Sequence, residues 1–443
     1  MKLYLYMKNF ALTVIVTFVI FLSAHASPVK LKLPLLDYPF VKQAPNNVPS
    51  MHQSMQLSQS FYNGAHYLIF KKLKTSNKHK YYTSLLFDFV TTWTPLGTTW
   101  LHEEWHRAVM GQYGIKSFDD VNRFPFFSDA ISVSKVKDED LVRLKQLYPA
   151  DMVRLTSAGF EASNVFSLHL QKNQFFDNYQ LHMGFNDWVQ HVNSWFYLDT
   201  CASNEADAFT QRFLKEENQD VSKRDFAGLD CTAWVYDLFR PDGPYSSRGI
   251  HPSGTGIDRY IQFSDLTLKE KHYLIKQRNL FLINFIDPFL FGFTHFSLNT
   301  NNTLLYWNAN MEHYLAPFGH AITINTFLKF QQYKLMLSLH RFSNEALNLP
   351  GYSFEIHELP FVLGTQNLNL SIRTSLWRQP RQLLFSERSV QLGGLISASL
   401  NSTISQLWHL SIQTTYKSKG WEPGQVYLGQ QWSSQIALFY VLP

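Results

Sequence analysis

The sequence predicts a mixed α+β fold, in which a mainly helical N-terminal domain precedes a C-terminal antiparallel β-barrel of about eight strands. A change in periodicity along the chain carries this prediction. Over residues 56–300, apolar side chains recur at spacings of three and four residues, the period of an amphipathic helix. Over residues 301–443 they recur at every second position, the period of a strand with one apolar face.

The N-terminus has the three parts of a secretory signal peptide. Two lysines precede an apolar run from Phe10 to Leu22, and Ala24-His25-Ala26 forms a small-residue cleavage site. The apolar run is shorter than the roughly 20 residues that a helix needs to cross a bilayer. We therefore expect residues 1–26 to be cleaved and the protein to be exported, with an uncleaved membrane anchor as the alternative. Residues 27–55 are rich in proline and lack periodicity, which predicts an extended lead-in.

The strand-like region contains eight runs in which apolar and polar residues alternate. Most of them reach the roughly 9–11 residues that a tilted membrane strand requires, and an even number of strands can close without free edges. The polar face is mainly Asn, Ser, Gln, Thr and His, which suits a narrow lumen better than an open surface. An outer-membrane barrel is the favoured interpretation, and a soluble eight-stranded barrel is the alternative. The runs are 303–313, 319–330, 333–342, 352–359, 366–377, 388–400, 407–417 and 434–442.

Composition indicates lipid and argues against nucleic acid as a partner. Aromatic residues make up 16% of the chain, an excess that suits a protein facing lipid. The net charge of +5 is spread thinly, because 39 Lys and Arg stand against 34 Asp and Glu and no basic block stands out. We expect outer-membrane lipid as a partner and no nucleic acid.

Cys201 and Cys231 are the only two cysteines. An exported chain meets an oxidising compartment, so a disulfide between them is expected, with two separate buried thiols as the alternative. Two cysteines are too few for a cysteine-based zinc site. Any zinc site must therefore use His, Asp or Glu.

The motif His102-Glu103-x-x-His106 has the spacing of a zinc site. On a helix, two histidines four positions apart share one face, so both rings can reach a single ion at ~2.0–2.1 Å. Glu103 is rotated to the side of the ion, where it can accept a proton from a zinc-bound water. The motif lies in a helical run from Thr98 to Tyr113. The sequence predicts His102 and His106 as metal ligands and Glu103 as the general base.

Zinc needs a third protein ligand, and Glu161 is the leading candidate. It stands in the apolar stripe of a helical run from Met152 to Leu170, where a carboxylate is costly unless a cation meets it. Asn164 follows one turn later and can support the ligand. A buried salt bridge of Glu161 with Arg107 or Arg154 is the alternative. Three later histidines are the rival third ligands: His169, His182 and His191.

This arrangement resembles the gluzincin class of zinc metallopeptidases, in which a glutamate on a later helix joins the HExxH histidines. The resemblance covers residues 95–168 and nothing in the strand-rich half. It implies a zincin-like helical domain, a Zn²⁺ cofactor bound by the two histidines and Glu161, and a water activated by Glu103. The chain departs from the class pattern because Val165, and not an aspartate, follows Glu161 by four positions. The resemblance therefore supports zinc and hydrolysis more than one substrate.

The favoured function is a zinc-dependent hydrolase of the bacterial cell envelope, acting on peptides or proteins. Its helical domain is expected on the periplasmic side of an outer-membrane barrel, with a soluble periplasmic protein as the alternative location. Two other functions stay open. One is a non-enzymatic outer-membrane barrel protein with a helical binding or assembly module, and the other is a hydrolase that acts on lipid.

Overall fold

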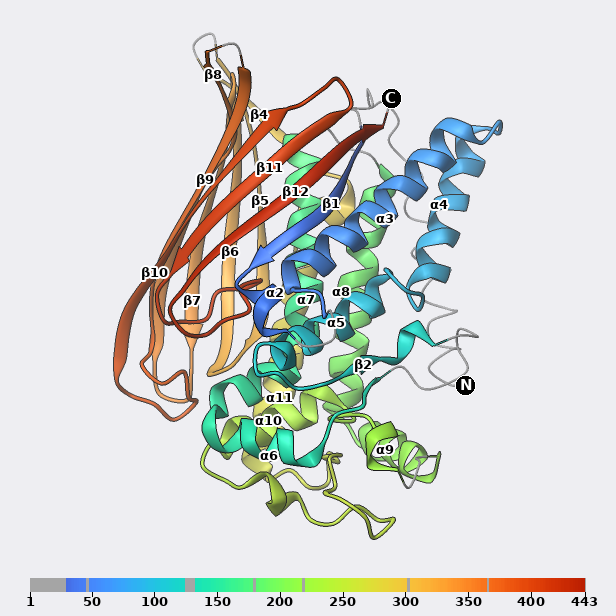
Figure 1. Ribbon diagram of the computed structural model, residues 1–443, viewed down its shortest axis with the longest axis vertical. Helices are drawn as coiled ribbons and strands as arrows, with labels where there is room; N and C mark the ends of the chain where they lie inside the picture. Colours follow the sequence, from blue (N-terminus) through green and yellow to red (C-terminus); the bar gives the residue numbers. More distant parts are fainter. Residues whose placement is uncertain are drawn as a thin grey trace.

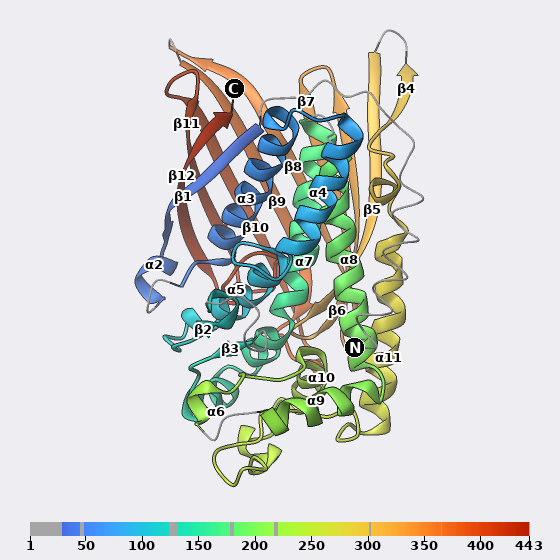
Figure 2. The same ribbon diagram turned by 90° about the vertical axis from the view of Figure 1, so that its right-hand side faces the viewer.

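The chain forms one curved antiparallel sheet with helices packed on its inner side (Figures 1 and 2). The α+β class is therefore confirmed. The predicted signal peptide, residues 1–26, lies outside the described residues. In this computed structural model, the described residues are 29–44, 48–123, 132–177, 181–216, 220–300, 303–364 and 366–442.

The helices occupy most of the sequence between the first strand and residue 281. Their bounds are α2 Phe40–Gln43, α3 Met51–Lys72, α4 Asn77–Thr91, α5 Thr98–Gly111, α6 Asp138–Leu147, α7 Pro149–Phe176, α8 Leu181–Cys201, α9 Glu205–Glu216, α10 Asp230–Phe239 and α11 Leu268–Phe281. None of the helices in the described ranges is both long enough and apolar enough to cross a bilayer.

Ten strands form the main sheet, in the order β1-β12-β11-β10-β9-β8-β7-β6-β5-β4. All eight predicted runs are strands, but the sheet has two more, and within the described chain β1 and β4 are its free edges. The predicted closed barrel of eight strands is therefore corrected to an open sheet of ten. The bounds are β1 Val29–Tyr38, β4 Phe296–Thr300, β5 Thr303–Ala316, β6 Gly319–Phe330, β7 Tyr333–Ser343, β8 Asn348–Leu363, β9 Gln366–Pro380, β10 Val390–Thr403, β11 Trp408–Lys417 and β12 Gln431–Leu442.

Strand β1 comes from the segment that the sequence assigned to an extended lead-in. It is extended, but it pairs with β12, so that Val29 lies opposite Leu442 and Leu33 lies opposite Leu438. The register shifts between Pro34 and Leu36. Val29, Leu31, Leu33 and Leu35 do alternate with Lys30, Lys32 and Pro34, but the prolines of the segment favoured an extended lead-in over a strand.

Helix α3 seals the free edge of β1. The Ser60 hydroxyl accepts a hydrogen bond from the Lys32 backbone N–H at 2.7 Å and donates one to the Lys32 carbonyl at 2.8 Å. The Asn63 amide donates to the Lys30 carbonyl at 3.4 Å. An open strand edge normally exposes such groups. Here side chains of a helix satisfy them in place of another strand.

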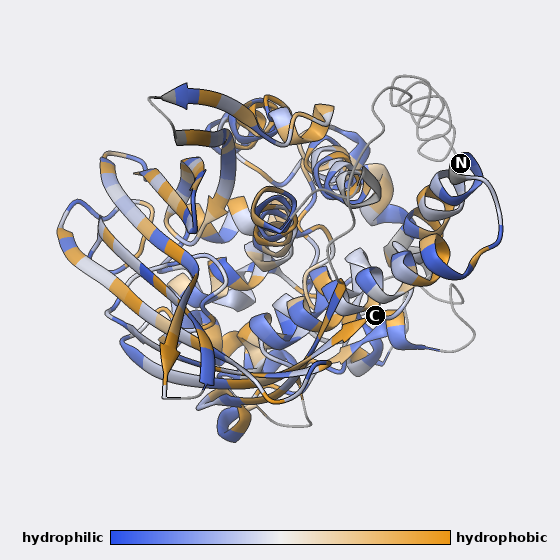
Figure 3. Cartoon of the chain, turned by 90° about the horizontal axis from the view of Figure 1, so that it is seen from above, coloured by the Kyte–Doolittle hydropathy of each residue, from blue (hydrophilic) through white to orange (hydrophobic). Residues whose placement is uncertain are grey.

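The helical and strand-rich parts share one core. Seen from above, the sheet curves around the helices that lie on its inner side (Figure 3). Leu315 of β5, Phe385 and Val426 belong to the same buried apolar cluster as Trp105 of α5 and Leu155 of α7. One buried cluster therefore crosses the predicted boundary at residue 300, and a second, around Trp377 and Trp421, belongs almost wholly to the strand-rich part.

The sheet has an unusual polarity, because its buried face is polar and its exposed face is apolar. On β7, Ser338 is 3% exposed, whereas its neighbours Leu337 and Leu339 are 44% and 54% exposed. Other strands also bury polar residues and expose apolar ones, although their inner side holds buried apolar residues too, such as Phe327, Trp377 and Leu395. Buried polar residues are Thr323, Asn325, Ser353, Ser375, Ser397, Ser411 and Thr415; exposed apolar residues are Ile324, Tyr352, Leu376, Leu392, Ile396, Ile412 and Trp432.

Candidate metal centre

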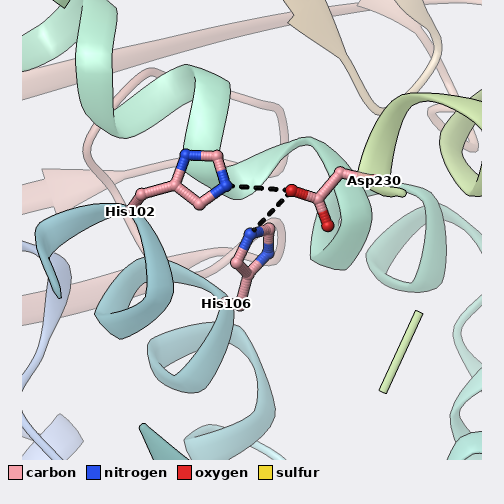
Figure 4. Close-up of side chains that lie close together, drawn as sticks. All are labelled: His102, His106 and Asp230. Carbon is pink, nitrogen blue, oxygen red and sulfur yellow. Dashed lines mark hydrogen bonds and ion pairs between the residues drawn. The ribbon is translucent and has the colours of Figure 1, made fainter. Parts of the chain in front are cut away.

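Two histidines of α5 and one aspartate of α10 converge beneath the inner face of the sheet (Figure 4). The same carboxylate oxygen of Asp230 lies 2.9 Å from His102 Nε2 and 3.2 Å from His106 Nε2. His106 is fully buried, and the side chain of His102 is 12% exposed. The HExxH spacing thus directs both imidazole rings to one point, as the sequence predicts. The third side chain at that point is Asp230.

Helix α7 fixes the orientation of His106. Its Leu155 carbonyl accepts a hydrogen bond from His106 Nδ1 at 2.5 Å. This bond keeps a proton on Nδ1, so that Nε2 is the nitrogen that faces Asp230. His106 Nε2 is buried and has no hydrogen-bond partner with acceptable geometry. An imidazole held in this way is prepared for a metal ion.

Gly159 of α7 makes room for the other imidazole. A Cβ atom at this position would lie 2.2 Å from His102 Nε2, a distance that no side chain tolerates. The His102 ring therefore lies directly against the backbone of α7. His102 can occupy this position only because residue 159 is a glycine.

Asp230 is the first residue of α10 and is anchored on both sides. Its backbone N–H donates to the Tyr197 hydroxyl at 2.9 Å. The next residue, Cys231, forms the predicted disulfide with Cys201, and their Cα atoms are 6.0 Å apart. The bond ties the first turn of α10 to the last turn of α8, which also carries Tyr197. The disulfide thus holds the carboxylate beside the histidines.

The protonation of the three side chains is shared. Burial disfavours charge on all of them, but the imidazoles hold the pKa of Asp230 below its ordinary range, and Asp230 raises the pKa of His106 to about 9. Burial lowers the pKa of His102. In the ion-free protein a proton on His106 therefore balances the aspartate. A metal ion would displace that proton, as metals do when they bind imidazole.

Glu103 lies near the centre and is not engaged by other side chains. Burial raises its pKa well above the ordinary value; His106 opposes this shift, and the carboxylates of Asp230 and Asp225 add to it. Among the described residues, no side-chain hydrogen bond engages the Glu103 carboxyl group. A divalent cation beside it would lower its pKa again.

Tyr197 is a site residue that the sequence did not reveal. Its ring stacks on Phe160 at a centroid distance of 5.4 Å and lies 6.0 Å from the His102 ring. Burial, together with Asp230, raises the pKa of the hydroxyl well above 10, so it stays protonated. Since this hydroxyl accepts from the Asp230 backbone, its own proton is free to be donated. No local motif marks Tyr197, because it meets the centre only through the packing of α8 on α10.

The structure corrects the predicted role of Glu161. Its carboxylate accepts hydrogen bonds from Arg154 at 2.8 and 3.3 Å, from the Trp421 indole at 3.0 Å and from the Gly424 backbone at 2.9 Å. The buried charge is thus met by a guanidinium, which was the alternative reading of the sequence. Asn164 does not support a ligand either, since its amide donates to the His313 carbonyl at 2.7 Å.

Two of the rival histidines are also engaged elsewhere. His169 Nε2 bonds with Gln59 at 2.8 Å, and His191 Nε2 lies 3.4 Å from Asp187. The side chain of His182 lies outside the described residues. The sequence did not identify Asp230 as a site residue, because a single aspartate 124 positions after His106 belongs to no recognisable spacing.

Comparison with protein-family models, with curated proteins and with solved structures finds no match for this chain. The functional argument therefore rests on the side chains themselves. The three that converge are two imidazoles and a carboxylate, a donor set that zinc accepts once the imidazoles are neutral.

Asp230→Asn is expected to weaken zinc binding by more than the roughly 10–100-fold that loss of a supporting residue costs, because a neutral amide replaces a charged ligand. Glu161→Gln is the matched control. It leaves the buried Arg154 uncompensated at a cost of about 3–5 kcal/mol, but it should retain zinc. Metal analysis after dialysis and thermal unfolding measure both effects. Loss of zinc in Glu161→Gln with retention in Asp230→Asn would restore the original assignment.

Gly159→Ala is expected to displace the His102 ring and to lower zinc affinity, because its methyl group needs the space of the imidazole. Gly64→Ala on α3 is the control, since its Cβ would meet only Leu31 at 3.5 Å. Zinc titration of the two folded variants measures the difference. Equal affinities would show that His102 has room to shift and still bind.

Proposed function

We propose that this protein is a zinc-dependent hydrolase in which His102, His106 and Asp230 bind the metal and Glu103 is the general base. One observation carries the proposal. Two imidazole nitrogens from one helical face, that of His106 fully buried, meet a single carboxylate oxygen of Asp230.

The dimensions of the three-residue group suit zinc. Tetrahedral ligands ~2.0–2.2 Å from an ion are about 3.3–3.5 Å from one another. The observed separations of 2.9 and 3.2 Å are within a few tenths of an ångström of that range. Three protein ligands leave a fourth position for water or substrate, as in catalytic sites. Zinc, when bound, lowers the pKa of water towards neutrality and polarises a carbonyl group.

The residues around the ligands have matching roles. Glu103 takes the proton of the attacking water and returns it to the leaving group. The Tyr197 hydroxyl donates a hydrogen bond to the oxygen on which negative charge develops. Substrate approaches from the side of His102, because His106 has no exposed surface.

A peptide bond is the substrate that we favour. HExxH with a later carboxylate is the pattern of zinc peptidases, although the carboxylate here is an aspartate and the gluzincin pattern has a glutamate. Amide hydrolysis needs proton transfer both to and from the reacting atoms. In this proposal Glu103 is the acceptor and Tyr197 is the donor.

We further propose that the outer face of the sheet contacts outer-membrane lipid. Soluble proteins rarely expose a broad apolar patch, and they do not bury the polar face of a sheet in exchange. Lipid-facing strands have this inverted polarity. Helix α4 extends the apolar surface with a stripe of Tyr82, Leu86, Phe89 and Val90, which are 37–63% exposed. The β1 edge that α3 seals also meets the rule that backbone groups in lipid be satisfied.

Glu103→Gln is expected to lower hydrolysis of a peptide library by roughly 10²–10⁴-fold while zinc content stays unchanged, because the amide cannot accept the proton. Cleavage is followed by mass spectrometry, with metal analysis of the same samples. Lipid esters tested in parallel distinguish a lipid hydrolase. A zinc-loaded wild-type protein that cleaves neither class would leave the non-enzymatic alternative.

Lysine in the middle of the outer face is expected to destabilise the protein in bilayers by about 2–4 kcal/mol per residue. Leu339→Lys and Leu376→Lys are the test variants, and Leu268→Lys on α11, a position that is 74% exposed and outside the sheet, is the control. Flotation with phospholipid vesicles measures membrane association. Wild-type protein that stays in the aqueous fraction would contradict the lipid-facing assignment.

A further inference from the structure

A second group of metal-ligand residues lies on α8. Asp187 and His191 are four positions apart on one helical face, and Asp287 precedes the short 3₁₀ helix Pro288–Phe291. The candidate ligand atoms of the three all lie within 4.8 Å of one another. Each side chain is at most 2% exposed. This group, which we call the α8 cluster, has no part in the zinc site described above.

The carboxylates of the α8 cluster have no lysine or arginine partner in the described chain. Besides His191 Nε2, which lies 3.4 Å from Asp187, only amide and hydroxyl groups meet them, among them the Phe289 backbone N–H on Asp287. Gln171 of α7 donates to both, at 2.9 Å to Asp187 and 2.7 Å to Asp287, and the Ser167 hydroxyl also donates to Asp187. The side-chain amide of Gln171 thus holds Asp187 and Asp287 side by side. Two buried carboxylates this close repel each other when both are charged.

Two buried atoms near the α8 cluster remain unpaired. His191 Nδ1 has no partner, while Nε2 of the same ring contacts Ser167 at 3.0 Å. Glu312 Oε1 is also unpaired, and this third acid is joined to Gln171 through Asn310 and Asn325. Each such atom costs about 1–3 kcal/mol in a dry interior. The nitrogen of His191 that faces Asp187 is Nε2, and a cation held between it and the two carboxylates would remove their repulsion.

We propose that Asp187, His191 and Asp287 form a second divalent-cation site. Two carboxylates and one imidazole form a hard, mixed oxygen and nitrogen donor set that suits Mn²⁺ or Zn²⁺. Gln171 and Ser167 orient the ligands, as residues behind metal ligands commonly do. Without the ion, protons neutralise the group, since burial raises the pKa of Asp187 to about 7.

The α8 cluster is too far from the first centre to share an ion with it. Tyr197, which contacts Asp230, follows Asp187 by ten positions on α8, which is about 15 Å at the helical rise of 1.5 Å per residue. The bound ion would join α8 to the segment that leads into β4, with α7 behind both. Its expected role is to fasten the helices to the first strands of the sheet.

The test measures how many metal ions bind to each chain when the first site has been removed. His102→Ala protein is stripped with a chelator, equilibrated with Mn²⁺ and passed over a desalting column, and the retained metal is counted. About one ion per chain is expected, together with an Mn²⁺-dependent rise in melting temperature. Adding Asp287→Asn, which keeps the size and one acceptor oxygen, should abolish both. Adding the exposed Asp242→Asn should abolish neither.

The two proposals fail in different ways. Wild-type protein that binds one zinc ion, combined with His102→Ala protein that binds no Mn²⁺ or Zn²⁺, would overturn the second site and leave the hydrolase intact. An ion that is lost in Asp287→Asn but retained in His102→Ala would support the second site and count against the first. Retention of about one ion in the His102→Ala, Asp287→Asn protein would also overturn the assignment of the α8 cluster.

Discussion

The packing of α7 along the inner face of the sheet is the contact on which the rest of the structure depends. Two residues of this helix position the HExxH imidazoles. The Leu155 carbonyl accepts a hydrogen bond from His106, and Gly159, which has no side chain, leaves room for the His102 ring. Further along, Glu161 holds the loop around Trp421, and Ser167 reaches Asp187. A single helix therefore connects the candidate metal centre, the α8 cluster and the sheet.

The polarity of the sheet follows from the same arrangement. A helix that carries Asn164 and Gln171 needs polar partners, and the inner face supplies them through the His313 carbonyl and Asn310. The apolar side chains of the strands must then point outward, because successive residues alternate between faces. The hydrogen bonds inside the sheet and the apolar residues outside it are thus two consequences of one register.

Local features were predictable wherever they depended on near neighbours in the sequence. Alternation located all eight strands between residues 303 and 442, and the motif located both histidines, because period two and the i, i+4 spacing are fixed by backbone geometry. Strand β1 was missed because the prolines of its segment indicated a loop, although Val29, Leu31, Leu33 and Leu35 alternate with other residues. The sealing of its edge by Ser60 was equally invisible, since it joins two segments that share no pattern.

The sequence by itself determined most element types, the disulfide partners and two of the three converging side chains. Only the tertiary structure decided between Glu161 and Asp230, because both are carboxylates and only packing shows which one meets Arg154 and which one meets imidazole. It also decided that the sheet is open, since closure depends on what lies beside its edge strands. Both outcomes depend on contacts between residues that are far apart in the chain. Such contacts balance charge in space, and the spacing of residues along the sequence gives no information about them.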